Sequence, residues 1–355
     1  MKGEHPILSG STAFFEALMA RAKQERFPVS ASFEVTSRCN QRCLHCYLGA
    51  SEGNGPKELD TAQACSIVDK IAQAGCLILL ITGGEPMLRP DFGELYRHAK
   101  ERGLAVRVFT NGTRVDDDVV QLFRNYPPLE VEITLYGSTP EMSQAVTGSD
   151  TGYARCQEGI QRLLDHGVRV KLKTVVLHQN HTGLPAMKAQ AERLGVPFRF
   201  DPVIFPTLEG DQGPLACRLS PAAAVLAETE SSTRSSEPPR VPPPLAPDER
   251  ENLFSCGAGR TSFAVDSAGV MTPCLLMRGI KYDLVRGAFD EGWSQMEAVC
   301  RMKANADSPC HTCSNVAFCH RCPAIFERET GCMGQPPDWV CDLALQRCVA
   351  NEKHK

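Results

Sequence analysis

The chain has 355 residues, of which 42% are hydrophobic and 23% are charged, and its formal net charge is −4. This length exceeds one ordinary core and predicts one large α/β unit with a smaller unit attached. The lack of a basic excess argues against nucleic acid as the main partner. The N-terminus lacks the apolar core of a signal peptide, and the longest apolar run, residues 76–81, is too short to span a bilayer. We therefore expect a cytoplasmic protein with no membrane partner.

The first 205 residues predict a helix followed by a parallel sheet. Residues 11–24 resemble one amphipathic helix that begins at a Ser/Thr cap. Short apolar strands then alternate with helical patterns such as 61–74 and 154–166. The strand candidates are 32–36, 76–82, 104–110, 129–136, 168–176 and 196–201. Six βα units in succession predict parallel strands with right-handed crossovers, which a doubly wound sheet and a partial barrel both satisfy.

Alternation within the strands favours the barrel. Val131 and Ile133 oppose Glu132, where a sheet covered on both faces would read as a continuous apolar run. The polar face of the predicted sheet carries Glu34, Arg107, Glu132, Lys171, Lys173, Arg199 and Asp201. Buried charges need partners, which a polar ligand in a barrel lumen or an ion-pair network without a ligand would supply. We predict an α/β fold with a partial (β/α)6 TIM-like barrel and a small cysteine-rich C-terminal domain.

Four segments follow from these patterns. We predict an N-terminal helix at 1–29, the barrel at 30–205, a bridging Ser/Pro-rich linker at 206–255 and a cysteine-rich domain at 256–348.

Seventeen cysteines are unusual for a cytosolic chain. Reducing compartments disfavour disulfides, so dense cysteine there indicates metal ligation. Thirteen of them cluster, three at 39–46 and ten between 256 and 348. The four isolated residues are interpreted as ordinary buried thiols: Cys65, Cys76, Cys156 and Cys217.

The stretch "CNQRCLHCY" places Cys39, Cys43 and Cys46 at C-x3-C-x2-C spacing after the first strand. A structural zinc site would need four closed ligands. A [4Fe–4S] cluster takes one thiolate per iron, so three thiolates leave one iron open to chelate a small molecule. Zinc is the alternative that this motif leaves open.

The motif resembles that of the radical S-adenosylmethionine (radical SAM) superfamily. The resemblance implies that the amino and carboxylate groups of SAM hold the open iron. The reduced cluster then gives an electron to the sulfonium, and a 5′-deoxyadenosyl radical abstracts a hydrogen atom from substrate. In such enzymes the cofactor carries the difficult chemistry, and the protein orients it and excludes water.

Further motifs at strand ends agree with the resemblance: "GGEP" (83–86), "TNGT" (110–113) and "TLYG" (134–137). Many relatives carry an Arg shortly after the fourth strand that contacts SAM, and "MSQAVTG" (142–148) has none, so Lys171 or Lys173 is the expected substitute. Glu85 is expected to receive the amino group of SAM. The resemblance implies cofactor contacts from His45, Gly83, Gly84, Glu85, Asn111, Thr134 and Lys171.

The C-terminal cysteines resemble a SPASM domain, which binds two auxiliary [4Fe–4S] clusters. By analogy, the distal cluster would use Cys310, Cys313, Cys319 and Cys341, and the proximal one Cys256, Cys274 and Cys322. The spacing between Cys319 and Cys322 is x2, where x3 is usual. No eighth cysteine lies between Cys256 and Cys274, so the proximal cluster has an open iron or a ligand from elsewhere. The spare candidates are Cys217, Cys300, Cys332 and Cys348. Two closed zinc sites are the alternative.

Three functions are compatible with these motifs. The leading hypothesis is oxidative cross-linking of a ribosomally made precursor peptide, with a reductant such as flavodoxin or ferredoxin. Leu275 stands where formylglycine-forming relatives carry Asp, which disfavours that reaction. Only about 30 residues precede the barrel, so leader recognition would need a separate leader-binding protein or another surface. A radical SAM enzyme acting on a sugar, alcohol or tetrapyrrole is the second hypothesis, and a non-enzymatic zinc scaffold is the third.

Overall fold

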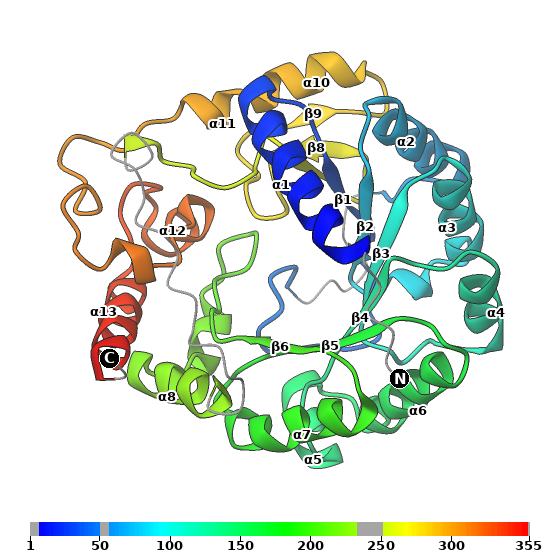
Figure 1. Cartoon of the computed structure of the whole chain (residues 1–355), viewed down its shortest axis with the longest axis horizontal. Helices are drawn as coiled ribbons and strands as arrows, with labels where there is room; N and C mark the ends of the chain where they lie inside the picture. The colour runs from blue at the N-terminus through cyan, green and yellow to red at the C-terminus, as the bar shows by residue number, and fades with distance from the viewer. Residues whose placement is uncertain (1–6, 50–56, 233–250, 354–355) are drawn as a thin grey trace.

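The computed structural model describes residues 7–49, 57–232 and 251–353. A curved sheet lines the inside of the molecule, and most of the helices lie on its outer side. In this view the chain forms a ring around an open middle (Figure 1). The strands of the barrel are β1 (Ser30–Thr36), β2 (Ile78–Gly83), β3 (Ala105–Thr110), β4 (Glu130–Thr134), β5 (Val170–Val175) and β6 (Phe198–Asp201). The helices between them are α2 (Thr61–Gln73), η1 (Pro86–Leu88), α3 (Phe92–Glu101), α4 (Asp117–Asn125), α5 (Pro140–Thr147), α6 (Gly152–Asp165), η2 (His181–Gly183) and α7 (Leu184–Leu194).

The predicted partial barrel is confirmed. Strands β1 to β6 are all parallel and follow one another in the sheet in chain order. Their apolar side chains, such as Val106, Val131 and Leu172, are buried under the helices. Helix starts are set locally: Asp60 caps α2 in a capping box with Gln63, which satisfies otherwise unpaired backbone donors.

The C-terminal region is less separate than predicted. It contains β7 (Ser262–Val265), β8 (Val270–Thr272) and β9 (Tyr282–Asp283), and β7 pairs in parallel with β1. The result is one nine-stranded sheet of order β6-β5-β4-β3-β2-β1-β7-β8-β9. The cysteine-rich segment therefore covers the β1 edge that a six-stranded half barrel would leave unpaired. Its helices are α10 (Phe289–Met296), α11 (Ala298–Arg301), η4 (Val316–Phe318), α12 (Pro323–Thr330) and α13 (Asp338–Lys353).

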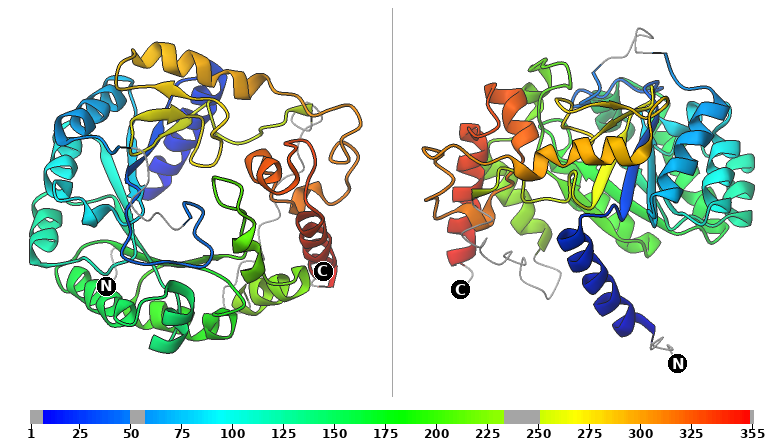
Figure 2. Two further views of the ribbon diagram at one scale, coloured as in Figure 1. Left: turned by 180° about the vertical axis from the view of Figure 1, so that it is seen from behind. Right: turned by 90° about the horizontal axis from the view of Figure 1, so that it is seen from above.

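The predicted start of the N-terminal helix is wrong. Helix α1 spans Ile7–Glu25, so the expected Ser/Thr cap lies inside it; the side view shows α1 projecting away from the sheet (Figure 2). The predicted linker contains η3 (Gly213–Cys217) and α8 (Pro221–Ser232). Helix α8 packs on α13, with Arg347 bonded to Glu228 at 2.9 Å and 2.5 Å. Most of the Pro-rich part, 233–250, falls outside the described residues. Within those residues, no helix is long and apolar enough to cross a membrane.

Candidate active site

The loop after β1 carries the first three cysteines and is held from two sides. The backbone N–H of Gly84 donates to Thr36 O, and that of Glu85 donates to Arg38 O, both at 2.8 Å. On the opposite side, the N–H of Arg42 donates to Thr147 O at 2.8 Å at the end of α5. The loop thus leaves β1 along a fixed path over the carboxyl ends of the strands, where barrel active sites lie.

Gly83 and Gly84 allow this path. A Cβ on Gly83 would lie 2.2 Å from Thr36 O, and one on Gly84 would lie 2.2 Å from Arg38 O. Gly83 also has a φ of +145°, which side chains rarely adopt. The atoms that require glycine here belong to the backbone of the cysteine loop. The described contacts therefore give the two glycines a role in placing the cysteines, beside the cofactor contact predicted for them.

Glu85 is fully buried and clamps the ends of two strands. Its carboxylate accepts hydrogen bonds from Thr110 Oγ1 at 2.8 and 2.9 Å, Asn111 N at 2.8 Å and Met87 N at 3.2 Å. Burial raises the pKa of Glu85 to about 7, against the hydrogen bonds that favour the carboxylate. Glu85 therefore ties β2 to β3 beneath the cysteine loop, and its predicted contact with the amino group of SAM remains a prediction.

Asn111 reaches from the end of β3 to the cysteine loop. Its Nδ2 donates to Asn40 Oδ1 at 3.0 Å and lies 3.9 Å from Cys39 Sγ. Asn40 in turn donates from Nδ2 to Thr113 Oγ1 at 2.8 Å. The "TNGT" motif thus faces the first cysteine, as its position at a strand end predicted.

The three thiols lie within electrostatic reach of one another. Burial raises the pKa of Cys43, Cys46 and Cys39, and neighbouring thiolates raise the pKa of Cys43 and Cys39 further. Buried thiolates without a positive charge nearby are unfavourable. A cation bound by all three thiolates would offset both their burial and their mutual repulsion. The sequence did not single out Tyr136, whose hydroxyl bonds to Cys43.

His45 lies among these groups with an unsatisfied nitrogen. Its Nδ1 is buried without a hydrogen-bond partner, and its ring centroid is 5.9 Å from that of Tyr136. Burial lowers the pKa of His45 to about 4, so the ring is neutral near pH 7. In the described ranges no three His, Cys, Asp or Glu side chains already stand at metal-ligand spacing. The fit to a cluster therefore rests on the donor set and on this orphaned polar atom.

The concave face carries the predicted charges, and an ion-pair network connects four of them. Glu132 is 4% exposed and lies 2.8 Å from Arg199, 3.9 Å from Lys171 and 4.0 Å from Lys173. Lys173 also lies 3.2 Å above the ring of Phe109. Lys171 is therefore engaged by Glu132, and a contact with SAM would have to compete with that pairing. Thr134 ends β4 directly beside Lys173.

Lys173 predicts a pH dependence of stability. Burial first, and then Arg199, Lys171 and Arg107, lower its pKa to about 7 against the pull of Glu132. Since its unfolded pKa is near 10, the unfolded state binds more protons between these values, and stability rises with pH in that window. A Lys173→Met variant should gain most thermal stability over the wild type at pH 7 and below. That gain should shrink steadily toward pH 10 in anaerobic thermal unfolding; a pH-independent difference would contradict the lowered pKa.

The C-terminal cysteines form two groups. Cys256, Cys274 and Cys322 influence one another electrostatically, and Met277 N donates to Cys274 Sγ at 3.3 Å. The second group is Cys310, Cys313, Cys319 and Cys341. Burial raises the pKa of Cys319 and of Cys322, to about 12 and about 11. These electrostatic couplings fall within the same two sets that the resemblance assigned to the distal and proximal clusters, and the assignment itself stays a prediction.

Two of the spare candidates, Cys217 and Cys300, have other surroundings. Cys217 is buried in a small apolar cluster with Val146 and Leu177. Cys300 Sγ lies 3.5 Å from Gly259 O. Cys65, Cys76 and Cys156 are partly or fully buried among apolar side chains, as the interpretation of ordinary thiols requires.

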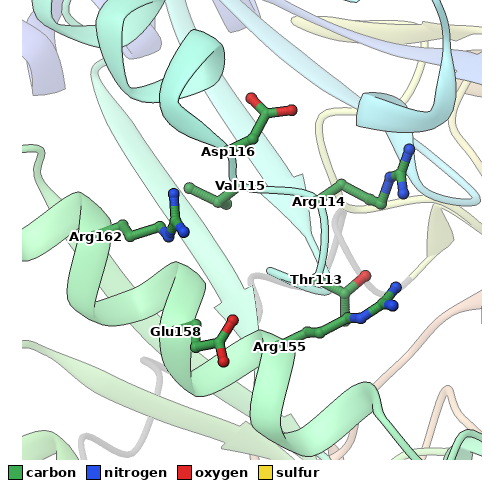
Figure 3. Close-up of a pocket in the computed structure, with 7 residues that line it drawn as sticks. All are labelled: Thr113, Arg114, Val115, Asp116, Arg155, Glu158 and Arg162. Carbon is green, nitrogen blue, oxygen red and sulfur yellow. The ribbon is translucent and has the colours of Figure 1, made fainter.

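A polar cavity adjoins the site. It has a volume of about 310 Å³ and lies between the loop after β3 and α6, with Glu158, Arg155 and Arg162 facing Thr113 and Asp116 (Figure 3). Its only connection described here to the cysteine loop is the Asn40 to Thr113 hydrogen bond. None of the predicted SAM contacts lines this cavity.

A parallel half barrel with three cysteines and a buried carboxylate at its carboxyl edge is the architecture of an enzyme that works through a metal-bound cofactor. Residues 33–187 match the family model of the Radical SAM superfamily, so this part of the chain is a radical SAM domain. Such a domain binds SAM and a [4Fe–4S] cluster. Cys39, Cys43 and Cys46 are the residues of the domain whose donor set and spacing fit that cluster.

Three known proteins are similar over different shares of the chain. Mycofactocin maturase MftC of Mycobacterium ulcerans is 26% identical over 342 residues, which are 92% of this chain and 91% of that protein. An AdoMet-dependent heme synthase of Methanosarcina barkeri is 30% identical over 186 residues, 52% of this chain and 53% of that protein. Streptococcus suis SuiB, crystallised with its precursor peptide SuiA, has a TM-score of 0.71 and 15% identity over 96% of this chain and 82% of that chain. The last likeness extends the shared fold into the C-terminal region.

Proposed function

We propose that this enzyme cleaves SAM reductively and uses the resulting radical to modify a ribosomally made precursor peptide oxidatively, most simply by cross-linking. The observation that carries the proposal is the similarity to a maturase over 92% of this chain. The neighbour SuiB, crystallised with a precursor peptide, has the same fold over 96% of the chain, which supports a peptide-sized substrate.

The cofactor assignment follows from the residues around the cysteine loop. Cys39, Cys43 and Cys46 would hold the cluster, which when bound supplies the electron for SAM cleavage. Asn111 Nδ2 lies 3.9 Å from Cys39 Sγ, and His45, between Cys43 and Cys46, has a buried Nδ1 without a hydrogen-bond partner. The chain's own contribution is to keep this loop in place, through Gly84 and Glu85, and to exclude water from it.

Two auxiliary [4Fe–4S] clusters are part of the proposal. The grouping of Cys256, Cys274 and Cys322, and the separate grouping around Cys319, support them. A one-electron donor such as flavodoxin or ferredoxin would reduce the enzyme, and a separate leader-binding protein is a candidate partner.

Iron analysis tests the metal assignment. Protein reconstituted without oxygen should contain about twelve irons per chain, because each of three cubes holds four. About eight irons would mean that one of the two auxiliary clusters is absent. Zinc in place of iron at the first three cysteines would overturn the catalytic assignment.

Incubation with candidate peptides tests the substrate. The reduced enzyme, SAM and a precursor peptide encoded near this gene should yield 5′-deoxyadenosine together with a peptide lighter by two hydrogen atoms. Omission of SAM is the control. If SAM is cleaved but no peptide from the neighbourhood changes mass, the peptide assignment fails and the radical SAM assignment stands.

A tetrapyrrole substrate is the second candidate. The 30% identity to an AdoMet-dependent heme synthase, over about half of each chain, favours it. An iron porphyrin with propionate side chains, incubated under the same conditions, separates the two functions. Loss of a propionate carboxyl group as CO₂ would support the tetrapyrrole reaction against the peptide one.

A further inference from the structure

A buried ion pair joins the barrel to the cysteine-rich region. Arg278 Nη2 lies 2.5 Å from Glu34 Oε2, and the two side chains are 14% and 5% exposed. Glu34 belongs to β1, and Arg278 follows Cys274 by four residues, so 244 positions separate the partners in the chain. A buried pair of this kind costs desolvation on both sides and is weak evidence for stability alone. Its position calls for another explanation.

The Glu34 end of the pair faces the first cysteine loop. Tyr47, which directly follows Cys46, donates from its hydroxyl to Glu34 Oε1 at 2.7 Å. The ring of Tyr47 packs 6.2 Å from that of Phe205, and Leu208 N donates to Tyr47 O at 2.7 Å.

The Arg278 end faces the second group of cysteines. Met277, which directly precedes Arg278, donates from its backbone N to Cys274 Sγ at 3.3 Å. Arg278 Nε is buried without a hydrogen-bond acceptor, and Asp266 lies 3.7 Å from Nη1. A second cation stands nearby, since Arg328 donates from Nη2 to Leu276 O at 3.3 Å, two residues after Cys274.

The pair is therefore a fixed dipole between two thiolate sites. Its negative end is the carboxylate bonded to Tyr47, which follows Cys46, and its positive end is the guanidinium of the residue after Met277, whose N–H bonds to Cys274. The reduction potential of an iron–sulfur cluster depends on nearby charge, hydrogen bonds and exposure. Negative charge stabilises the oxidised cluster and positive charge stabilises the reduced one, and both effects are strong where water is excluded.

We propose that the Glu34–Arg278 pair sets the potentials of the two centres in opposite directions, lowering that of the centre held by Cys46 and raising that of the centre held by Cys274. Glu34, Arg278 and Tyr47 are positioning residues, because they act through the cysteine ligands. The inference rests on the proposed clusters. These opposite shifts make the first centre the stronger electron donor and the second centre the better electron acceptor.

Potentiometric titration of the full-length, anaerobically reconstituted enzyme, followed by electron paramagnetic resonance, tests the proposal. Glu34→Gln should raise the midpoint potential of the first centre. Arg278→Gln should lower the midpoint potential of the Cys274 centre. The shift should be smaller than the one that removal of both nearby cations would cause, because Arg328 remains. Arg278→Lys keeps the charge and should restore the wild-type potential, which a merely structural role would not predict.

Glu132→Gln is the matched control, because it also removes a buried, ion-paired carboxylate from the concave face but one that lies among Arg199, Lys171 and Lys173. It should leave both potentials unchanged. Equal potentials in Arg278→Gln, Arg278→Lys and the wild type, at equal iron content, would overturn the proposal, even if Glu34→Gln does not fold. Failure of the peptide assignment would show separately, as SAM cleavage without a peptide product.

Discussion

Replacing Cys43 with alanine is expected to reduce the formation of 5′-deoxyadenosine to less than about one thousandth of the wild-type rate, because a cube needs each of its thiolates to stay in place. Cys43 lies between the other two cysteines of the loop and bonds to the Tyr136 hydroxyl. Its loss removes a ligand that no nearby thiol of the described loop can replace. The measurement is chromatography of reaction mixtures with SAM and excess dithionite, alongside iron analysis.

Cys65→Ala is the control for this variant. Cys65 lies on α2, is partly buried and packs against the main apolar core, away from the loop after β1. It should retain wild-type iron content and SAM cleavage. If Cys43→Ala still produced 5′-deoxyadenosine at the wild-type rate, the assignment of the cofactor to this loop would be wrong.

The barrel could be predicted because its signals are local. In β3, Val106 and Val108 alternate with Arg107, and this period of two separates the face under the helices from the lumen. The positions of the cysteines after β1 follow equally from the sequence, since parallel strands bring all their carboxyl ends to one edge of the sheet. The two C-terminal cysteine groups were predicted from a resemblance, and their assignment to two clusters stays a prediction.

The rest depended on contacts between distant segments. No local pattern says that β7 pairs with β1, because the register Ser30 to Ser262 joins positions more than two hundred residues apart. In the sequence, Arg278 is marked only by its position four residues after Cys274. Its partner Glu34 is marked only by its place on the polar face of the predicted sheet. The glycines of "GGEP" were expected to contact the cofactor, whereas the atoms closest to an added Cβ at either position are backbone atoms at the end of β1 and in the cysteine loop. A pair of glycines indicates that some group comes close to the backbone, but the sequence does not identify that group.

Replacing Gly84 with alanine should therefore damage the site although all three cysteines of the loop remain. An added Cβ would lie 2.2 Å from Arg38 O and 2.6 Å from Arg38 C, and both are backbone atoms that cannot swing aside. Relief requires the hydrogen bonds to Thr36 O and Arg38 O to break, so that the cysteine loop moves off the end of β2. We expect a loss of about 3 kcal/mol in the free energy of unfolding, at the upper end for overpacked sites.

Gly93→Ala provides the matched comparison. Gly93 lies in the first turn of α3, and a Cβ there would meet only Leu122 Cδ2 at an ordinary 3.8 Å. Alanine should stabilise this position by up to about 1 kcal/mol, because it is the better helix former. Anaerobic urea unfolding measures both variants, and iron analysis shows whether the Gly84 variant loses the first cluster while keeping the others. Because the clash concerns only the loop after β1, retention of all iron at wild-type stability would mean that the loop is not held by this contact. The glycine would then serve only the ligand contact that the sequence predicted.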